Sequence, residues 1–547
     1  MKPGIMDSVI GGHHDLEVFS RARRSGFAGV EVGLARTELR APGGRRVASL
    51  RAAARDTSLE IPSLVLGEHN EGGLGDADPQ VVAEAAEDVR TAIAWAEALG
   101  ADVVLVPFFL RGELVDGAQV ERVARALRAL CPLAAERGVS LCYEGTLPAD
   151  AVRQLAAQVD SPAFGCYFDL ANPVARGMDT ATEARALGPL VRRVHLKDTR
   201  VRGGDSHPGL GRVDFAESAR ALREIGYDGW LVFETPAAPE AVVRRDLSFA
   251  RSRFPLEGEP RWPRLGAFSY EFGAGEGERM ADAFRRLGLE AVQLGGALLD
   301  ACLGDPNRIG ALKSVLDESG IAVAGLAGYR NLVAPDPAVR RANVERLARC
   351  LELAPLLGTT VVATETGTLH PESDWIDVPG NWREEAWKAL DDAIAALLPV
   401  AERSGTVLAV EPHVGNVLKM PGQLIGLLER FPSEHLQVVC DPYNFLSRHL
   451  IPAQERIVRD VLDRFEHRFV LAHLKDVAVR DGETVTPEFG TGVFVQRPYL
   501  EFLRTRRPDL PLILEHLPLE HLPLDHIPAA LGRIRDLAGP AARAAAG

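Results

Sequence analysis

Short runs of apolar residues alternate with amphipathic stretches along the first half of the chain. Residues 103–106 (Val-Val-Leu-Val) are one apolar run, and in residues 79–99 apolar side chains recur every three or four positions. A period near 3.6 predicts a helix, whereas a continuous apolar run predicts a strand that is buried on both faces. The predicted strands of the first half are residues 4–6, 29–33, 61–66, 102–106, 139–143, 164–168, 191–196 and 230–233.

Eight strand–helix units in about 250 residues favour a closed (β/α)8 barrel, in which helices cover a ring of parallel strands. The same order of runs restarts at residue 265, after a charged segment that contains three prolines. Prolines among charged residues are typical of a linker. We therefore predict an α/β protein of two tandem (β/α)8 TIM barrels, residues 1–254 and 265–540, joined by a linker at residues 255–264.

Four polar side chains recur, in the same order, at the ends of predicted strands in both halves. The first set is Glu144, Asp169, His195 and Glu234, and the second is Glu411, Asp441, His473 and Glu515. The flanking residues match too, for example Val-His-Leu-Lys-Asp around His195 and Ala-His-Leu-Lys-Asp around His473. The offsets between partners are 267, 272, 278 and 281 residues. They drift in one direction, as expected for a duplicated domain with a few loop insertions.

The carboxyl ends of the strands of a (β/α)8 barrel converge on one mouth, where active sites lie. Three carboxylates and an imidazole in one mouth would repel one another without a cation, and a divalent metal suits such mixed oxygen and nitrogen ligands. The absence of cysteine ligands disfavours a structural zinc site. A single carboxylate at a strand end is often a helix cap, but a complete set found twice favours function. We predict one divalent ion per barrel, with Mn²⁺, Mg²⁺, Co²⁺ and Zn²⁺ all acceptable.

Composition narrows the range of functions. The 547 residues have a formal net charge of −14, which disfavours binding to a phosphate backbone as the main task. We therefore expect a small-molecule sugar or polyol as partner and no nucleic acid. No segment reaches the ~18 apolar residues of a membrane span, and the first residues do not resemble a signal peptide. The six cysteines form no CxxC pair, so we expect reduced core residues in a cytoplasmic protein. A homo-oligomer is left open.

Both halves resemble the xylose-isomerase-like TIM barrel superfamily, the group of sugar phosphate isomerases and epimerases. The motifs that carry the resemblance are CYEG, YFDLANPVARG, VHLKDTR, HPGLGRVDF and GYDGWLVFE in the first half, and AVEPHVGN, VCDPYNFL, AHLKD, FGTGVF and LILEH in the second. The resemblance implies that each set of four residues binds a metal ion. It also implies that Glu144 with Glu234, and Glu411 with Glu515, act as acid and base.

The implied activity is a metal-dependent isomerisation or epimerisation of a sugar, keto-sugar or polyol. A metal-bound carbonyl makes the neighbouring C–H acidic, so that one glutamate removes the proton and the other returns one through a metal-held enediolate. The alternative on the same site is a lyase, which dehydrates a keto-polyol of the inosose or dehydroshikimate type. A non-catalytic sugar-binding protein is a third possibility. An AP endonuclease of the endonuclease IV type is a fourth, and the acidic charge disfavours it.

Six further side chains near these strand ends are candidates for substrate binding: Asn172, Lys197, His207, His413, Asn444 and Lys475. The two asparagines stand where many epimerases of the group have a histidine, and an amide can donate to a substrate hydroxyl. The two lysines follow the metal histidine by two positions and so point to the same side of the strand. They either neutralise a substrate oxyanion or pair with a carboxylate. The second half also has a long loop at residues 364–383, a candidate lid.

Overall fold

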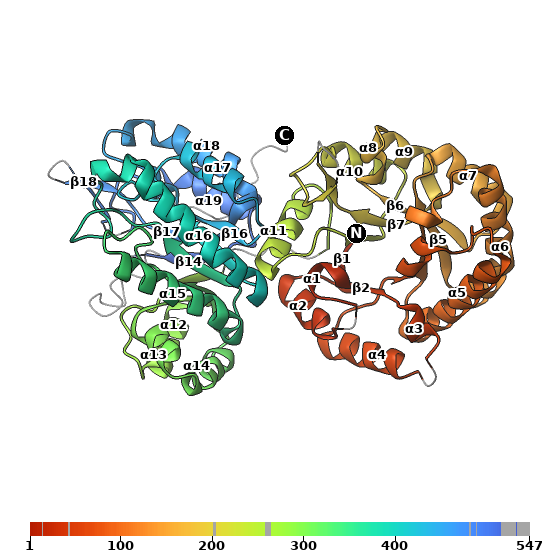
Figure 1. Ribbon diagram of the computed structural model, residues 1–547, viewed down its shortest axis with the longest axis horizontal. Helices are drawn as coiled ribbons and strands as arrows, with labels where there is room; N and C mark the ends of the chain where they lie inside the picture. Colours follow the sequence, from red (N-terminus) through yellow and green to blue (C-terminus); the bar gives the residue numbers. More distant parts are fainter. Residues whose placement is uncertain are drawn as a thin grey trace. The chain divides into compact units, whose positions relative to one another are not determined.

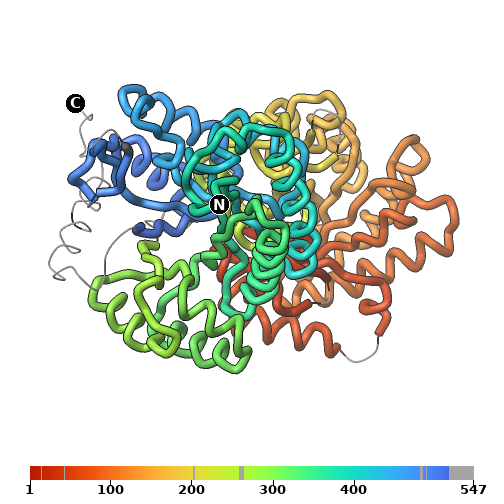
Figure 2. Tube along the Cα trace, turned by 60° about the vertical axis from the view of Figure 1, so that its left-hand side comes forward, coloured from red at the N-terminus to blue at the C-terminus, as the bar shows by residue number. Residues whose placement is uncertain are grey.

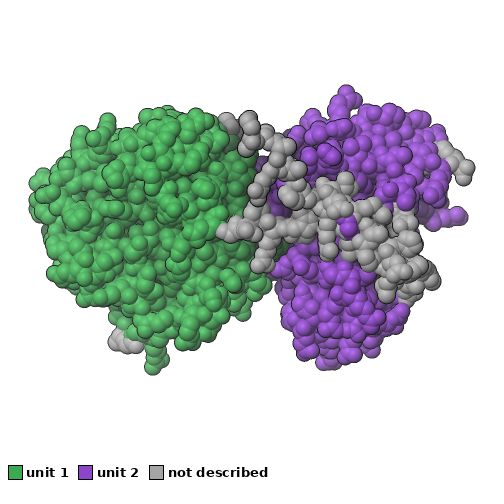
Figure 3. All heavy atoms as spheres, turned by 180° about the vertical axis from the view of Figure 1, so that it is seen from behind, with its two compact units in different colours: residues 1–259 green, residues 260–547 purple. Residues whose placement is uncertain are grey.

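The computed structural model describes residues 1–13, 15–41, 44–200, 204–257, 264–480, 483–487, 489–515 and 532. The chain divides into two compact units, residues 1–259 and 260–547 (Figure 3). It completes the first unit before it begins the second, as the sequence colours of Figure 2 show. Residues 258–263 of the predicted linker, and nearly all of the chain after residue 515, lie outside the described residues.

The described part of the first unit contains a closed ring of eight parallel strands with helices around it (Figure 1). The strands are β1 (Lys2–Met6), β2 (Gly29–Gly33), β3 (Leu64–Val65), β4 (Val103–Phe108), β5 (Ser140–Gly145), β6 (Phe164–Asp169), β7 (Val191–Leu196) and β10 (Trp230–Phe233). The helices are α1 (Asp7–Ile10), α2 (Glu17–Ser25), α3 (Arg36–Leu39), α4 (Arg45–Thr57), α5 (Pro79–Leu99), α6 (Gly117–Glu136), α7 (Ala149–Val159), α8 (Asn172–Ala175), α9 (Thr180–Leu187), α10 (Phe215–Glu224) and α11 (Glu240–Arg251). After β7, the short strands β8 (Asp198–Thr199) and β9 (Asp205–Ser206) pair with each other.

The described part of the second unit repeats this ring of eight parallel strands. Its strands are β11 (Leu265–Phe268), β12 (Ala291–Leu294), β13 (Ala322–Ala327), β14 (Val361–Glu365), β15 (Val407–Glu411), β16 (Leu436–Cys440), β17 (Phe469–Leu474) and β20 (Leu512–Leu514), with a separate pair β18 (Ala478–Arg480) and β19 (Glu483–Val485). Its helices are α12 (Gly277–Leu287), α13 (Gly296–Gly304), α14 (Asn307–Glu318), α15 (Pro337–Leu353), α16 (Glu384–Ser404), α17 (Pro421–Arg430), α18 (Gln454–Phe465) and α19 (Gln496–Thr505). The prediction of two tandem (β/α)8 barrels is confirmed.

Side-chain alternation along the strands decides which residues reach the inside of a barrel. In β5, Cys142 belongs to the cluster inside the first ring, whereas Leu141 packs in the outer cluster. Residues two apart on a strand share a face, so Glu144 points inward at the mouth. The same spacing takes the chain from Tyr167 in the inner cluster to Asp169 at the mouth. The strand pattern therefore aims these acids into the barrel.

Matching helices of the two units begin in the same way. The carboxylate of Asp78 accepts a hydrogen bond from the backbone N–H of Gln80 at the start of α5, at 2.8 Å. Asp336 repeats this with the backbone N–H of Ala338 at the start of α15, at 2.7 Å. Each bond satisfies one of the backbone donors that a helix start leaves unpaired. The duplicated sequence thus reproduces its local structure.

Two predictions drawn from the composition concern the cysteines and the membrane-spanning segments. All six cysteines are buried and unpaired, which confirms their prediction as core residues. No helix in the described residues combines the length and the apolar character that crossing a bilayer requires.

Candidate metal centres

The mouth of the first barrel brings together the four residues that the sequence predicts as metal ligands. Glu144, Asp169, His195 and Glu234 each offer one ligand atom, and these atoms lie within 4.8 Å of one another. Nδ1 of His195 is 3.1 Å from Oε1 of Glu144 and 3.2 Å from Oε2 of Glu234. Two backbone N–H groups donate to Oδ1 of Asp169, at 2.7 and 2.8 Å. Oδ2 of Asp169 has no hydrogen-bond partner in the described part of the chain.

This donor set fits a divalent cation. Three carboxylates surround one imidazole, and Glu144, Asp169 and His195 are buried. A buried carboxylate oxygen without a hydrogen-bond donor, as in Asp169, is costly unless a charge compensates for it. Nζ of Lys197, at 3.7 Å, supplies charge but is too far away to donate a hydrogen bond, which leaves the oxygen open to a cation. Oxygen ligands with one nitrogen suit Mg²⁺, Mn²⁺, Co²⁺ and an open zinc site.

The charges of the first mouth change the acidity of its groups. Burial raises the pKa of Glu144 to about 7. Burial would also raise the pKa of Glu234, but Lys197 and His195 outweigh it and lower that pKa. For His195, burial would lower the pKa, but the carboxylates of Glu234, Glu144 and Glu31 outweigh it and raise the pKa well above its usual value. Glu144 and His195 therefore hold protons near neutral pH, and a bound cation would displace them.

Glu31 on β2 holds the side of His195 that faces away from the other ligands. The Nε2–H of His195 donates to Oε1 of Glu31 at 2.8 Å. The hydroxyls of Ser63 and Tyr167 both donate to its other oxygen, and Glu31 is completely buried. An acceptor on one ring nitrogen fixes the tautomer, so that the other nitrogen is free to bind metal. The predicted strand at residues 29–33 contains Glu31, but the sequence pattern assigns no role to it.

The second mouth brings together three of its four predicted ligands. Glu411, Asp441 and His473 offer atoms within 4.8 Å of one another. Nδ1 of His473 is 3.4 Å from Oε1 of Glu411 and has no hydrogen-bond partner among the described residues. Glu515 stands outside this group. Nζ of Lys475 donates to its Oε2 at 2.7 Å and lies 2.8 Å from Oδ2 of Asp441.

An amide replaces the carboxylate behind the second histidine. The Nε2–H of His473 donates to Oε1 of Gln293 at 2.8 Å. The side-chain N–H of Gln293 donates to the hydroxyl of Tyr329 at 3.2 Å, and that hydroxyl donates to Oε2 of Glu411 at 2.7 Å. The hydrogen bond to the ring is therefore the same in both barrels, but the second lacks the negative charge of Glu31.

The pKa values of the second mouth follow the same physics. Burial raises the pKa of Glu411. Burial opposes the charge of Asp441 as well, but Lys475 and His473 outweigh it and lower the pKa of Asp441. Burial would lower the pKa of His473, but Glu411 and Asp441 outweigh it and raise that pKa to about 10.

The lysines and asparagines predicted to bind substrate differ in their contacts. Lys197 donates to Oε2 of Glu234 at 2.8 Å, so both lysines pair with carboxylates, one of the two roles considered for them. The side chain of Asn444 donates to Oε1 of Glu411 at 2.6 Å. The side-chain nitrogen of Asn172 has no hydrogen-bond partner in the described residues, and Asn172 lines a cavity of about 30 Å³ beside Glu144.

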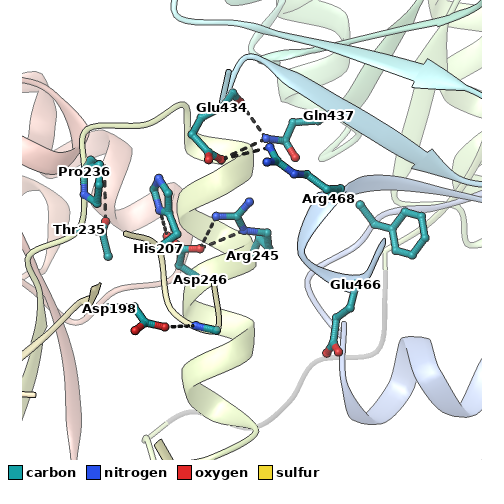
Figure 4. A network of polar contacts seen from close by, with 12 residues as sticks. Asp198, His207, Thr235, Pro236, Arg245, Asp246, Glu434, Gln437, Glu466 and Arg468 are labelled. Carbon is teal, nitrogen blue, oxygen red and sulfur yellow. Dashed lines mark hydrogen bonds and ion pairs between the residues drawn. The ribbon is translucent and has the colours of Figure 1, made fainter. Parts of the chain in front are cut away.

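The two predicted histidines also differ. His207 is buried, and its Nδ1–H donates to Oδ2 of Asp246 on α11 at 2.6 Å, while Arg245 donates to the other oxygen of Asp246 (Figure 4). His413 lines the cavity over the second mouth, and its Nδ1 accepts from the backbone N–H of Gly415 at 3.1 Å. Burial and the nearby Lys475 lower the pKa of His413 to about 4, so the ring is neutral.

An aspartate closes the loop that follows the predicted metal-binding histidine in both barrels. Asp198 accepts from the backbone N–H groups of Gly209 and Gly211, at 3.0 and 2.8 Å. Asp476 repeats both bonds in the second barrel, at 3.0 Å each. A Cβ on Gly211 would lie 2.2 Å from a carboxylate oxygen of Asp198, so only glycine fits there. The Gly-x-Gly motifs thus serve loop closure.

A cavity of about 760 Å³ opens over the second mouth. Residues 364–383, the predicted lid, form part of its wall, and Trp375 in this loop is 57% exposed. The buried Asn416 ties the loop down: its side-chain oxygen accepts from the backbone N–H groups of Thr366 and Gly367, at 3.1 and 2.8 Å. Its side-chain nitrogen donates to the carbonyl oxygen of Asp374 at 3.1 Å. Buried amide contacts, rather than buried tryptophans, hold this wall.

Comparison with known proteins shows that both halves of the chain match the same protein family. A family described as "Xylose isomerase-like TIM barrel" matches residues 19–253 and again residues 281–535. The chain is 34% identical over 229 residues to a 2-epi-5-epi-valiolone 7-phosphate 2-epimerase of an Actinoplanes species, a match that covers 41% of this chain and 78% of that protein. It is 28% identical over 263 residues to the L-ribulose-5-phosphate 3-epimerase UlaE of Salmonella typhi, covering 44% and 91%.

Each of two similar solved structures covers slightly less than half of the chain, about the length of one barrel. The 3-keto-D-glucoside 4-epimerase YcjR from E. coli is 20% identical, with 46% of this chain and 99% of that chain covered and a TM-score of 0.39. A D-psicose 3-epimerase from Clostridium cellulolyticum H10 is 19% identical, with 46% and 99% covered and a TM-score of 0.41.

Proposed function

Because the chain belongs to the xylose isomerase-like TIM barrel family, we propose that it is an epimerase or isomerase of a sugar, keto-sugar or polyol that uses one divalent metal ion in each barrel. The observation that carries the proposal is the first mouth, where three carboxylates and an imidazole offer ligand atoms within 4.8 Å of one another. The two relatives named above are both epimerases of phosphorylated compounds, which supports the reaction class.

Each barrel would hold its ion with the duplicated set: Glu144, Asp169, His195 and Glu234 in the first, and Glu411, Asp441, His473 and Glu515 in the second. When bound, the ion would stabilise negative charge that develops on a substrate oxygen. Glu144 and Glu234 would remove and return a proton at a substrate carbon. They stand at β5 and after β10, which β6 and β7 separate around the ring, so they reach the mouth from different sides. Glu411 and Glu515 repeat this arrangement.

Solvent exchange tests the proposal directly. The protein is incubated in D₂O with a panel of ketoses, ketose phosphates and inososes, with Mn²⁺, Mg²⁺, Co²⁺ or Zn²⁺ or with a chelator. We expect deuterium at one carbon of at least one substrate, dependent on metal, together with its epimer or isomer. Absence of exchange across the panel in metal-loaded protein would reject the proposal and favour a non-catalytic binding protein.

The same incubation separates the lyase alternative. Loss of water from a keto-polyol creates a conjugated enone, which absorbs in the ultraviolet, whereas epimerisation does not. We expect an epimer without that absorbance, because both named relatives are epimerases. Appearance of the enone without an epimer would replace the epimerase with a dehydratase on the same residues.

A further inference from the structure

Glu365 ends β14 beside the second metal centre. In the parallel pairing of β14 with β15 it stands directly opposite Glu411. It is half-buried and lines the cavity of about 760 Å³. Within the described part of the chain its carboxyl group has no hydrogen bond and no ion pair; only its backbone carbonyl accepts, from Thr364. A carboxyl group in such a place loses hydrogen bonds to water unless a ligand replaces them.

The neighbouring polar groups of the cavity already have partners in the protein. Lys475 pairs with Glu515 and Asp441. Asn444 and the hydroxyl of Tyr329 both donate to Glu411. These groups contact the predicted metal ligands, and Glu365 is left as an acid of the cavity wall to which no described group donates a hydrogen bond.

The first barrel offers no such acid at this position. In the pairing of β4 with β5, Pro107 stands opposite Glu144, and proline has no side-chain polar group. Glu31, the additional acid of the first barrel, is fully buried, and His195, Ser63 and Tyr167 donate to its oxygens. The additional acid therefore supports the histidine in one barrel and faces the cavity in the other.

We propose that Glu365 is a specificity-determining residue of the second barrel, which forms a hydrogen bond with one hydroxyl of a polyhydroxy substrate. The inference rests on the proposed function, because it takes the second mouth as a sugar site. A carboxyl group binds a hydroxyl in either protonation state, since the ionised form accepts and the neutral form both donates and accepts. Tyr270 and Trp375, 49% and 57% exposed, line the same cavity and offer the sugar apolar faces.

A site built to bind a hydroxyl rejects an analogue that lacks it, because the polar group of the protein then stays unpaired. The test measures binding of D-fructose and of its 1-, 3-, 4- and 6-deoxy analogues to the full chain loaded with Mg²⁺, through the fluorescence of Trp375. A Trp375→Phe variant shows which part of the signal comes from the cavity. We expect one analogue to bind the wild-type protein at least about tenfold more weakly than D-fructose.

Two substitutions at Glu365 then assign this discrimination. Glu365→Leu removes all hydrogen bonding, and we expect it to bind the rejected analogue and D-fructose within about threefold of each other. Glu365→Gln keeps an acceptor and a donor in the same shape and should retain most of the discrimination. Glu365→Ala takes the place of the leucine variant if circular dichroism shows that the latter is not folded.

Two results would overturn the inference: a folded leucine or alanine variant with the wild-type pattern of discrimination, or a wild-type chain that binds D-fructose and all four analogues equally or not at all. Deuterium exchange in the same samples separates this outcome from a failure of the proposed function. Discrimination in a chain that also shows no exchange with any member of the substrate panel would reject the epimerase and keep the role of Glu365. Deuterium exchange together with unchanged discrimination in the leucine variant would keep the epimerase and reject the role of Glu365.

Discussion

The two mouths share three of their predicted metal ligands as a compact group and differ in what surrounds them. Behind the histidine, the first barrel places the carboxylate of Glu31 and the second the amide of Gln293. On the neighbouring strand end, the first has Pro107 and the second Glu365. The second mouth also opens into a cavity of about 760 Å³ walled by a long loop.

The difference shows which parts of the two barrels match. The inward-pointing side chains at the strand ends are the same, whereas the loops and the neighbouring strands carry different residues. The ligands sit on β5, β6 and β7 and directly after β10, or at the equivalent places of the second ring, and alternation along a strand fixes their direction. The groups around them are free to change without moving the ligands. Under the proposed function, the two barrels would share a reaction type and differ in the substrate that they bind.

The strongest test of the shared chemistry removes one proton-transferring glutamate at a time. Glu144→Gln and Glu411→Gln should each lower turnover in one barrel by about 10²–10⁴-fold, because a positioned acid or base contributes that much. Substrate-dependent deuterium exchange measures the loss. Glu136→Gln and Glu402→Gln, on the exposed faces of α6 and α16, are matched controls that should keep full activity. If one variant abolished all turnover, the other barrel would be inactive and the symmetry of the mouths would be broken.

The next test exchanges the groups behind the two histidines. Glu31→Gln should weaken binding of the divalent ion in the first barrel by about 10–100-fold, because it removes the carboxylate that supports the ligand ring. Gln293→Glu should strengthen binding in the second barrel. Competition with a coloured chelator measures both constants. Equal affinities before and after the exchange would mean that the charge of Glu31 does not distinguish the sites.

The first barrel should also respond to pH near neutrality. The pKa of Glu144 is raised to about 7, and a divalent ion binds the ionised carboxylate, so ion and proton compete. As the pH falls through 7 the proton wins, and at one unit below this pKa about one tenth of the groups are ionised. In a His473→Ala chain we expect affinity at pH 6 to be at least about tenfold below that at pH 8, measured by calorimetry, because His195 must lose its proton as well. A flat profile between these pH values would contradict the raised pKa.

The smallest effect concerns the helix starts that the two units share. Asp78→Ala and Asp336→Ala each remove one capping hydrogen bond, so each should lower the free energy of unfolding of its own unit by about 1 kcal/mol. Urea unfolding followed by fluorescence measures the change. Glu345→Ala, at an exposed position inside α15, is the control and should have almost no effect. Unequal losses from the two caps would show that the units differ in local stability as well as in their mouths.

The sequence predicted the barrels and the inward set of acids because both follow from local pattern. Cys142 lies in a short apolar run, and Glu144 follows it by two positions, so a few neighbouring residues suffice to place both side chains on the same face of a strand. The role of Glu31 could have been read from the same alternation, since it lies within β2, but its partners Ser63 and Tyr167 come from distant segments.

Contacts between distant segments could not be predicted in this way. Asp246, which binds His207, follows it by 39 residues and belongs to a helix. Asn444 donates to Glu411, and Lys475 donates to Glu515. Glu515 lies outside the group that the other three predicted ligands form, although Glu234 lies within its own group. These choices depend on side-chain reach across the mouth, which no local spacing encodes.

The aspartates after β7 and β17 close their loops with donors from the backbone of the loop itself. Asp198 takes its donors from the segment that ends at Val213, and Asp476 from the segment that ends at Phe494. The loop of the first barrel is also tied to α11, where Asp246 accepts from His207. A protein engineer who grafts the first loop onto the second barrel would therefore have to bring the partner of His207 with it.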